Sequence, residues 1–219
     1  MPTCIVLGGT FDPVHNGHLL NARLLAERMG YEHIRLMPCG DAYHKVGSSR
    51  AKHRIAMLTA ALAEQSILTL DTQETQRTGA TYTVDTLYNL RQQLGKNAHI
   101  VWVMGCDAAA GLQHWHNWQQ IFKLANIIVF KREGEPNPDL SAWPAKVYSG
   151  TVTHDNSING ITEFKQQPFG CLLQLTLEPI AVSSSEIRQA LRNKQNVENH
   201  VPLSVIHYIE QHGLYQGKI

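Results

Sequence analysis

The sequence has no long hydrophobic run and no basic region at its N-terminus. A typical apolar stretch spans residues 100–104, whereas a helix needs about 20 consecutive apolar residues to cross a bilayer. The first seven residues, MPTCIVL, contain no lysine or arginine and lead directly into a glycine motif, unlike a secretory signal peptide. We therefore expect no membrane span and no secretory leader.

Cysteine is also scarce, and no two cysteines form a C-x-x-C pair. The four cysteines stand at positions 4, 39, 106 and 171. Disulfide frameworks and zinc sites bring cysteines together at characteristic short spacings. The spacing here predicts reduced thiols in a cytoplasmic protein.

Positively and negatively charged residues are nearly equal in number, so neither is in excess. The chain has 19 Lys and Arg against 18 Asp and Glu, a net charge of +1, whereas a generic nucleic-acid binder is strongly basic. We therefore expect no nucleic-acid partner. A hydrophobic content of 43% with 17% charged residues excludes a disordered chain. The length of 219 residues predicts one domain with a small appendage, and the count of twelve histidines is high.

Short apolar runs alternate with amphipathic stretches along most of the chain. Ala22, Leu25, Ala26 and Met29 have the spacing of one helical face, and Gly30 stops that helix. Further helices are expected near residues 51–62, 83–94, 184–192 and 202–212. Strands are expected near residues 4–7, 34–38, 67–70, 100–104, 127–130 and 173–177.

Continuous apolar strands alternating with helices predict a parallel sheet covered on both faces. The expected fold class is α/β, a doubly wound, Rossmann-like sheet over residues 1–182. A small C-terminal helical subdomain is expected over residues 183–219. Residues 133–170 are rich in proline and glycine, which predicts irregular structure with one strand near 146–148.

The segment GGTFDPVHNGH, residues 8–18, follows the first expected strand. Ligands of doubly wound sheets bind at the carboxyl ends of strands. Gly8 and Gly9 would let a ligand approach the backbone closely, and the start of the next helix favours an anion. His15 and His18 share one side of the first helical turn. We expect them to donate hydrogen bonds to a phosphate.

Other interpretations of this segment remain open. It does not match G-x-G-x-x-G, and no P-loop lysine follows, which disfavours dinucleotide-redox and P-loop sites. Two histidines at this spacing also suit a metal ion, although Cys4 and Asp12 complete no clear ligand set. A structural turn with incidental histidines is the third interpretation.

A serine-rich segment, VSSSEIR over residues 182–188, opens the penultimate expected helix. Ser183 and Glu186 have the spacing of a capping box, which accounts for them structurally. Ser184, Ser185 and Arg188 are not explained by the cap. Two hydroxyls and a guanidinium at a helix start suit a second phosphate site.

Residues 42–63 form a basic segment with Lys45, Arg50, Lys52 and Arg54 and no acid. A basic loop beside two helix starts suits a polyphosphate substrate. An ordinary solvated face is the commoner cause of such a run of charge.

These segments together resemble the nucleotidyltransferase superfamily marked by His-x-Gly-His and a Ser/Thr-rich segment ending in Arg. Within it, the chain resembles the bacterial nicotinate-nucleotide adenylyltransferases over nearly its whole length. The matching residues are 8–18, 44–45, 54, 57–58, 77, 81–83, 86–87, 105, 107, 115, 129, 132, 183–188, 208–209 and 213–215. The sequence departs from that family at Ala42–Tyr43, where Pro-Pro is common, and at Cys106.

The resemblance implies transfer of the adenylyl group of ATP to nicotinate mononucleotide, giving deamido-NAD and pyrophosphate in NAD biosynthesis. It implies catalytic roles for His15, His18 and Arg188. Mg²⁺ would bind mainly through the ATP phosphates and water, with no metal site of the protein's own. The implied ATP-binding residues are Gly8, Gly9, Thr10, Phe11, His15, His18, Gly105, Asp107, Arg132, Ser184, Ser185 and Arg188.

The resemblance also implies an acceptor site. Trp115 would stack on the pyridinium ring, and the helix start at Tyr82 and Thr83 would hold the carboxylate. On the residues alone, core packing suits both Trp115 and Trp118. The implied acceptor-binding residues are His44, Lys45, Tyr82, Thr83 and Trp115. Structural roles are expected for His33, His53, His99, His114, His116, His154, His200, His207 and His212.

Two alternatives remain at this point. The chain could be a related transferase whose acceptor is nicotinamide mononucleotide or phosphopantetheine. It could also be a nucleotide-binding module without turnover, which the presence of both phosphate motifs disfavours. The sequence does not determine whether the chain forms a homo-oligomer.

Overall fold

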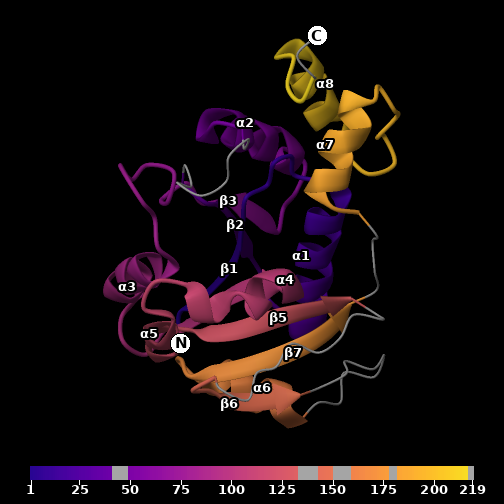
Figure 1. Ribbon diagram of the computed structural model, residues 1–219. Helices are drawn as coiled ribbons and strands as arrows, with labels where there is room; N and C mark the ends of the chain where they lie inside the picture. The colour runs from indigo at the N-terminus through magenta and orange to yellow at the C-terminus, as the bar shows by residue number, and fades with distance from the viewer. Residues whose placement is uncertain (41–48, 133–142, 150–158, 178–181, 217–219) are drawn as a thin grey trace.

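The computed structural model describes residues 1–40, 49–132, 143–149, 159–177 and 182–216. Within them, seven strands form one sheet in the order β3-β2-β1-β4-β5-β7-β6, with parallel neighbours throughout (Figure 1). The predicted α/β fold with a parallel sheet is confirmed. The strands are β1 (Thr3–Gly9), β2 (Ile34–Pro38), β3 (Leu68–Leu70), β4 (His99–Gly105), β5 (Asn126–Arg132), β6 (Lys146–Ser149) and β7 (Cys171–Leu177).

Helices cover both faces of the sheet (Figure 1), because successive strand residues point to opposite faces. Ile5 and Leu7 of β1 join the buried cluster beneath α1 (Asn16–Met29), α2 (Ala51–Leu62), α6 (Asn159–Gln166), α7 (Ser184–Arg192) and α8 (Leu203–Gln211). Cys4 and Val6 join the cluster on the other face, beneath α3 (Thr83–Leu94), α4 (Cys106–Ala110), the 3₁₀ helix η1 (Leu112–His114) and α5 (Trp118–Leu124). The sheet is therefore doubly wound, as predicted.

The strand order reverses direction at β1, which pairs with β2 on one side and β4 on the other. Leu7 of β1 lies opposite Leu36 of β2 and Val103 of β4, so these strands end at the same edge of the sheet. Ligands of such sheets bind outside the carboxyl ends of the strands where the order reverses. The histidine segment after β1 and the residues that follow β4 both start at this edge.

Short helices are where the sequence-based prediction fails. β6 confirms the strand expected near residues 146–148, but α6 shows that irregular structure over 133–170 is wrong for 159–166. Phe164 is fully buried and Ile161 packs against the same core, so the core stabilises a helix too short to show clear periodicity. The sequence also gave no sign of α4, η1 and α5, each of seven residues or fewer.

The C-terminal helices share the core of the sheet. Ile187 of α7 and Val205 and Ile209 of α8 belong to the buried cluster that α1 and α2 cover. The predicted division between residues 182 and 183 stays a prediction. Nowhere in the described part of the chain is a helix long and apolar enough to cross a membrane.

A buried polar network joins the amino ends of β4 and β5 to neighbouring connections. His99 Nδ1 donates to the Gln167 carbonyl at 2.6 Å, so the unprotonated Nε2 accepts the Tyr31 hydroxyl at 3.2 Å. Asn126 donates to the same Gln167 carbonyl and accepts from the backbone N–H of Cys171. Burial lowers the pKa of His99, which stays neutral. The structural role expected for His99 is confirmed.

Candidate active site

The glycines that end β1 are explained by packing against aromatic rings. A Cβ on Gly8 would lie 2.5 Å from Trp102 of β4, and one on Gly9 would lie 2.9 Å from the Phe11 ring. Both distances are too short for a real side chain, so a larger residue would displace the rings. Close approach of a ligand to Gly8 and Gly9 stays a prediction.

The two histidines of the motif stack on each other at the start of α1. Their ring centroids lie 3.7 Å apart with the planes inclined by 30°. The backbone N–H of His15 donates to His18 Nδ1 at 3.3 Å, so the neutral His18 ring carries its proton on Nε2. His15 is buried and His18 is partly exposed. The pair thus presents a ring donor at the carboxyl edge of the sheet.

The residues around the histidines fix their rings. A Cβ on Gly17 would lie 3.0 Å from His15 Nδ1 and 3.3 Å from Val182, so glycine leaves room for the His15 ring. The Phe11 ring meets His18 edge-on with centroids 4.9 Å apart. Because Phe11 is 1% exposed, its ring supports His18 from within the core, and its predicted contact with ATP stays a prediction.

The start of α7 docks onto the same loop. The Ser184 hydroxyl donates to the Pro13 carbonyl at 3.0 Å, and Arg188 Nη1 donates to the Asp12 carbonyl at 2.7 Å. Arg188 Nη2 also donates to Ser185 Oγ at 3.1 Å. The structure therefore joins two motifs that are more than 160 residues apart in the sequence.

The predicted capping box of α7 is confirmed. The Glu186 carboxylate accepts from the Ser183 backbone N–H at 2.8 Å, and Ser183 Oγ accepts from the Glu186 N–H at 3.2 Å. This cap holds the amino end of α7, and with it the dipole of the helix, at the edge of the sheet where the histidines lie.

A buried arginine joins the loop after β1 to both ends of the connection between β2 and α2. Arg54 is 1% exposed, and its guanidinium donates to the carbonyls of Thr10 at 3.0 Å, Ser49 at 3.1 Å and Gly40 at 3.3 Å. The interpretation of residues 42–63 as an ordinary solvated face is therefore wrong for Arg54. Its charge stabilises the loops rather than contacting solvent.

Aromatic side chains gather between α3 and the segment that follows η1. Tyr82, the N-cap of α3, is 41% exposed and stacks on His116 with ring centroids 4.3 Å apart. Trp115 is partly buried against the core on this face. Trp118 meets Phe122 edge-on within α5, so core packing accounts for Trp118. Trp115 and Trp118 are both partly buried against this core, so the choice of Trp115 as the stacking surface stays a prediction.

The first turn of α3 is anchored by a buried chain of polar groups. The Thr86 hydroxyl donates to Glu74 Oε1 at 2.7 Å, and Arg77 Nη1 donates to Thr86 Oγ1 at 2.9 Å. Thr86 is fully buried and Glu74 is 5% exposed. Burial raises the pKa of the Glu74 carboxyl, against the smaller effects of Thr86 and Arg77.

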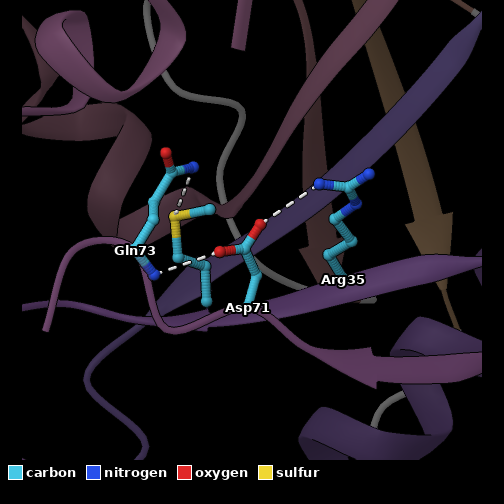
Figure 2. Close-up of polar contacts among 4 residues, drawn as sticks. Arg35, Asp71 and Gln73 are labelled. Carbon is cyan, nitrogen blue, oxygen red and sulfur yellow. Dashed lines mark hydrogen bonds and ion pairs between the residues drawn. The ribbon is translucent and has the colours of Figure 1, made fainter. Parts of the chain in front are cut away.

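Figure 2 shows the polar contacts of Asp71 and Gln73, which closely precede Glu74 in the sequence and fix this turn to the sheet. Asp71 pairs with Arg35 of β2 at 3.3 Å and accepts from the backbone N–H of Gln73 at 3.1 Å. The Gln73 amide reaches the sulfur of Met37 at 3.9 Å. The position of α3 is therefore set from the sheet through this turn.

Comparison with known proteins identifies the family. The family model described as cytidylyltransferase-like matches residues 6–190. A Hahella chejuensis protein named probable nicotinate-nucleotide adenylyltransferase is 38% identical over 213 residues, covering 96% of this chain and 94% of that protein. The chain belongs to the nicotinate-nucleotide adenylyltransferase family. A Saccharophagus degradans protein of the same name is 36% identical, with 96% and 95% covered.

Solved structures agree with this adenylyltransferase fold. Plasmodium falciparum nicotinic acid mononucleotide adenylyltransferase complexed with NaAD matches with a TM-score of 0.71 at 18% identity, covering 98% of each chain. A structure titled as a putative nicotinate-nucleotide adenylyltransferase from Vibrio parahaemolyticus matches with a TM-score of 0.63 at 14% identity. At these identities the likeness concerns the fold.

The remaining predicted residues of this adenylyltransferase lie at the same edge or outside the described residues. Gly105 ends β4 and caps α4, and the exposed Asp107 lies in the first turn of α4. Arg132 ends β5, which places its backbone at the same edge. His44 and Lys45 lie outside the described residues. The unexpected Cys106 donates to the Phe130 carbonyl, which gives it a structural role.

One contact beside the histidines was missed from the sequence. Asp12 and Tyr215 meet at the histidine loop, and no local pattern could have paired them. The exposed ring of His116 stacks on Tyr82, and the structural role expected for His116 stays a prediction.

Proposed function

We propose that this chain transfers the adenylyl group of ATP to nicotinate mononucleotide, forming deamido-NAD and pyrophosphate. The observation that carries the proposal is the docking of Ser184 and Arg188 onto the loop that leads to His15 and His18. Two helix starts with cationic and hydroxyl side chains then face one edge of the sheet, as a polyphosphate requires. The names of the relatives support the choice of acceptor.

The reaction needs no nucleophile from the protein. An oxygen of the mononucleotide phosphate attacks the α-phosphorus of ATP in line, the new P–O bond forms, and the bond to the leaving pyrophosphate breaks. The attacking phosphate is already ionised at neutral pH. Catalysis then rests on positioning and on neutralising the phosphate charge.

The histidines would act on the phosphate that reacts. His18 would donate from Nε2 to the α-phosphate, with its ring held by His15 and Phe11. Arg188, Ser185 and the start of α7 would hold the β- and γ-phosphates as pyrophosphate leaves.

The acceptor would bind between α3 and the loop after η1. Trp115 would stack on the pyridinium ring, and the amino end of α3 at Thr83 would receive the carboxylate. Asp107 would accept hydrogen bonds from a ribose. An amide brings no full negative charge to that helix end, which favours the nicotinate form.

Mg²⁺ would be carried by the nucleotide phosphates and supply charge neutralisation when bound. In the described part of the chain, no group of three or more His, Cys, Asp and Glu side chains could hold a metal ion. Both carboxylate oxygens of Asp12, the acid in the histidine loop, already accept hydrogen bonds. The residues present therefore fit an ion held mainly by phosphates and water. None of the four cysteines, all of which lie in the described part of the chain, forms a disulfide, which supports the proposed cytoplasmic location.

A coupled assay of pyrophosphate release tests the proposal. We expect release only with ATP, nicotinate mononucleotide and Mg²⁺ together, and much slower release with nicotinamide mononucleotide or phosphopantetheine as acceptor. ATP binding by calorimetry without release for any acceptor would favour the nucleotide-binding module instead.

His18→Ala should lower kcat at least about 100-fold, the effect of losing one preorganised donor to the transition state. His207→Ala, which removes an exposed histidine of α8, is the control and should retain full activity. A near-normal kcat for His18→Ala in the same assay would remove His18 from the mechanism.

A further inference from the structure

The irregular loop between β1 and α1 is held by side chains from distant parts of the chain. Arg54 of α2 donates to the carbonyl of Thr10, and Arg188 of α7 donates to the carbonyl of Asp12. Between them, Phe11 has a φ of 52°, in the left-handed region that a bulky residue rarely adopts. The shape of the loop therefore depends on its anchors.

The carboxylate of Asp12 is a third anchor of this loop, and it is also buried. Asp12 is 2% exposed, its Oδ1 accepts the Tyr215 hydroxyl at 2.5 Å, and its Oδ2 accepts the backbone N–H of Ser49 at 3.1 Å. A buried carboxylate is costly unless hydrogen bonds satisfy it. Tyr215 and Ser49 thus fix the side chain of Asp12 in one orientation.

Tyr215 is itself held in an unusual conformation. Its φ is 62°, and such backbone conformations persist where the surroundings hold the residue in place. Its hydroxyl lies 3.9 Å from the sulfur of Met57, and its ring packs against the core. Burial and the bond to Asp12 raise the pKa of Tyr215, so the hydroxyl keeps its proton and remains a donor.

We propose that Tyr215 is a positioning residue for adenylyl transfer, which acts through Asp12 on the loop that places His15 and His18. This inference rests on the proposed function for its kinetic consequence. It assigns to the C-terminal segment a direct part in shaping the site, which neither the histidine motif nor the serine-rich motif includes.

The route from Tyr215 to the histidines is short. Asp12 follows Phe11, whose ring supports His18. Without the hydroxyl, Oδ1 of Asp12 is left short of a donor in a buried place, and the loop relaxes to satisfy it. Because a misplacement of about 1 Å can cost about 100-fold in rate, a partial shift should lower kcat about tenfold. The KM values should change little, since the phosphate-binding helix starts remain.

Tyr215→Phe tests this, because it keeps the ring and removes the donor. We expect kcat to fall about tenfold while KM for ATP and for nicotinate mononucleotide stays within about twofold. Tyr208→Phe is the matched control, since Tyr208 is a C-terminal tyrosine whose hydroxyl bonds to His53 of α2 at 3.0 Å. It should keep wild-type kcat. A merely structural role would make the two variants alike, and that result would overturn the inference.

A double variant tests the route through Asp12. If Tyr215 acts through Asp12, kcat of Asp12→Asn combined with Tyr215→Phe should match that of Asp12→Asn alone within about twofold. If the kcat losses of the two single variants multiply in the double variant, Tyr215 does not act through Asp12.

A measurement without turnover separates this inference from the proposed function. The imidazole NMR signals of His15 and His18 in the substrate-free protein should move in Tyr215→Phe and stay in place in Tyr208→Phe. Unmoved signals in Tyr215→Phe would overturn the inference, whether or not the wild-type protein releases pyrophosphate. Absence of pyrophosphate release from the wild type would count against the proposed function alone.

Discussion

Gly17 is required at its position by the side chain of a neighbour. The space that a Cβ would fill is bounded by His15 Nδ1 at 3.0 Å and by Val182 at 3.3 Å. Contacts this close force the neighbouring atoms to move by a few tenths of an ångström. The histidine ring, which stacks on His18, is the atom group that would move.

Gly17→Ala should therefore lower kcat about tenfold without unfolding the protein. Alanine favours the helix over glycine by about 1 kcal/mol, which offsets the strain from the His15 contact, so the melting temperature should change little. Gly111→Ala is the control, because its Cβ would meet its nearest neighbour only at 3.8 Å. Wild-type kcat in Gly17→Ala would show that the His15 ring has room to spare.

The sequence allowed some residues of the site to be predicted and hid others. His15 and His18 stand three residues apart at the start of a helix, so a local pattern was enough to place them together. Asp12 and Tyr215 are 203 positions apart, and Arg54 gains its role from three carbonyls in two separate loops. Such partners can be identified only from the folded structure, in which the sheet brings the loops together.

Helix α3 is positioned by polar groups at its first turn as well as by its apolar face. Val84, Leu87 and Leu90 bury that face, which fixes the side of the helix that meets the sheet. The bonds from Thr86 to Glu74 and from Arg77 to Thr86 add a fixed point near the amino end. The proposed carboxylate site lies at that end.

Thr86→Val, which keeps the shape and removes the hydroxyl, should weaken the acceptor site. The buried Glu74 carboxyl would lose its donor, at a cost of about 1–3 kcal/mol in the free energy of unfolding. KM for nicotinate mononucleotide should rise several-fold while KM for ATP stays within about twofold. Thr59→Val is the control, since the exposed Thr59 only bonds back to Ile55 of its own helix. Equal changes in both KM values would contradict a local effect at α3.

Element length decided which parts of the fold the sequence could predict. The 14 residues of α1 bury one stripe and end at Gly30 with φ 59°, so periodicity and the stop signal agreed. Helix α6 has eight residues and α4 has five, which is too few turns for a periodic pattern. These helices form because Phe164 and Ala109 fill the core, and that space is defined by the rest of the molecule.

At the scale of the whole molecule, the His99 network fastens the edge of the sheet opposite the site. His99, Asn126 and Gln167 connect β4, β5 and the end of α6, and Tyr31 adds the connection after α1. The network requires neutral His99, because Nε2 accepts a hydrogen bond. Stability of the fold is thereby linked to pH.

Acidification should destabilise the protein through His99. The pKa of His99 in the folded state is lowered, mainly by burial. Below the ordinary histidine pKa of about 6.5, His99 is therefore protonated in the unfolded state but still neutral in the folded state. Stability is then full above that value and falls as pH decreases, by at most about 1.4 kcal/mol per pH unit. Urea unfolding at pH 7.5 and 5.5 should show that the free energy of unfolding falls less with acidification in His99→Gln than in the wild type. An equal fall in the free energy of unfolding for both proteins would show that groups other than His99 cause the acid sensitivity.

The bond between Asp12 and Tyr215 also has a consequence for synthesis on the ribosome. Residues 8–18, which hold the histidine motif, leave the ribosome long before residue 215 does. Tyr215 is made 203 residues after Asp12, so the loop cannot gain this anchor until then. A nascent chain should therefore carry both histidines and still lack full activity. Adenylyl transfer at the full rate would begin only when residue 215 has emerged.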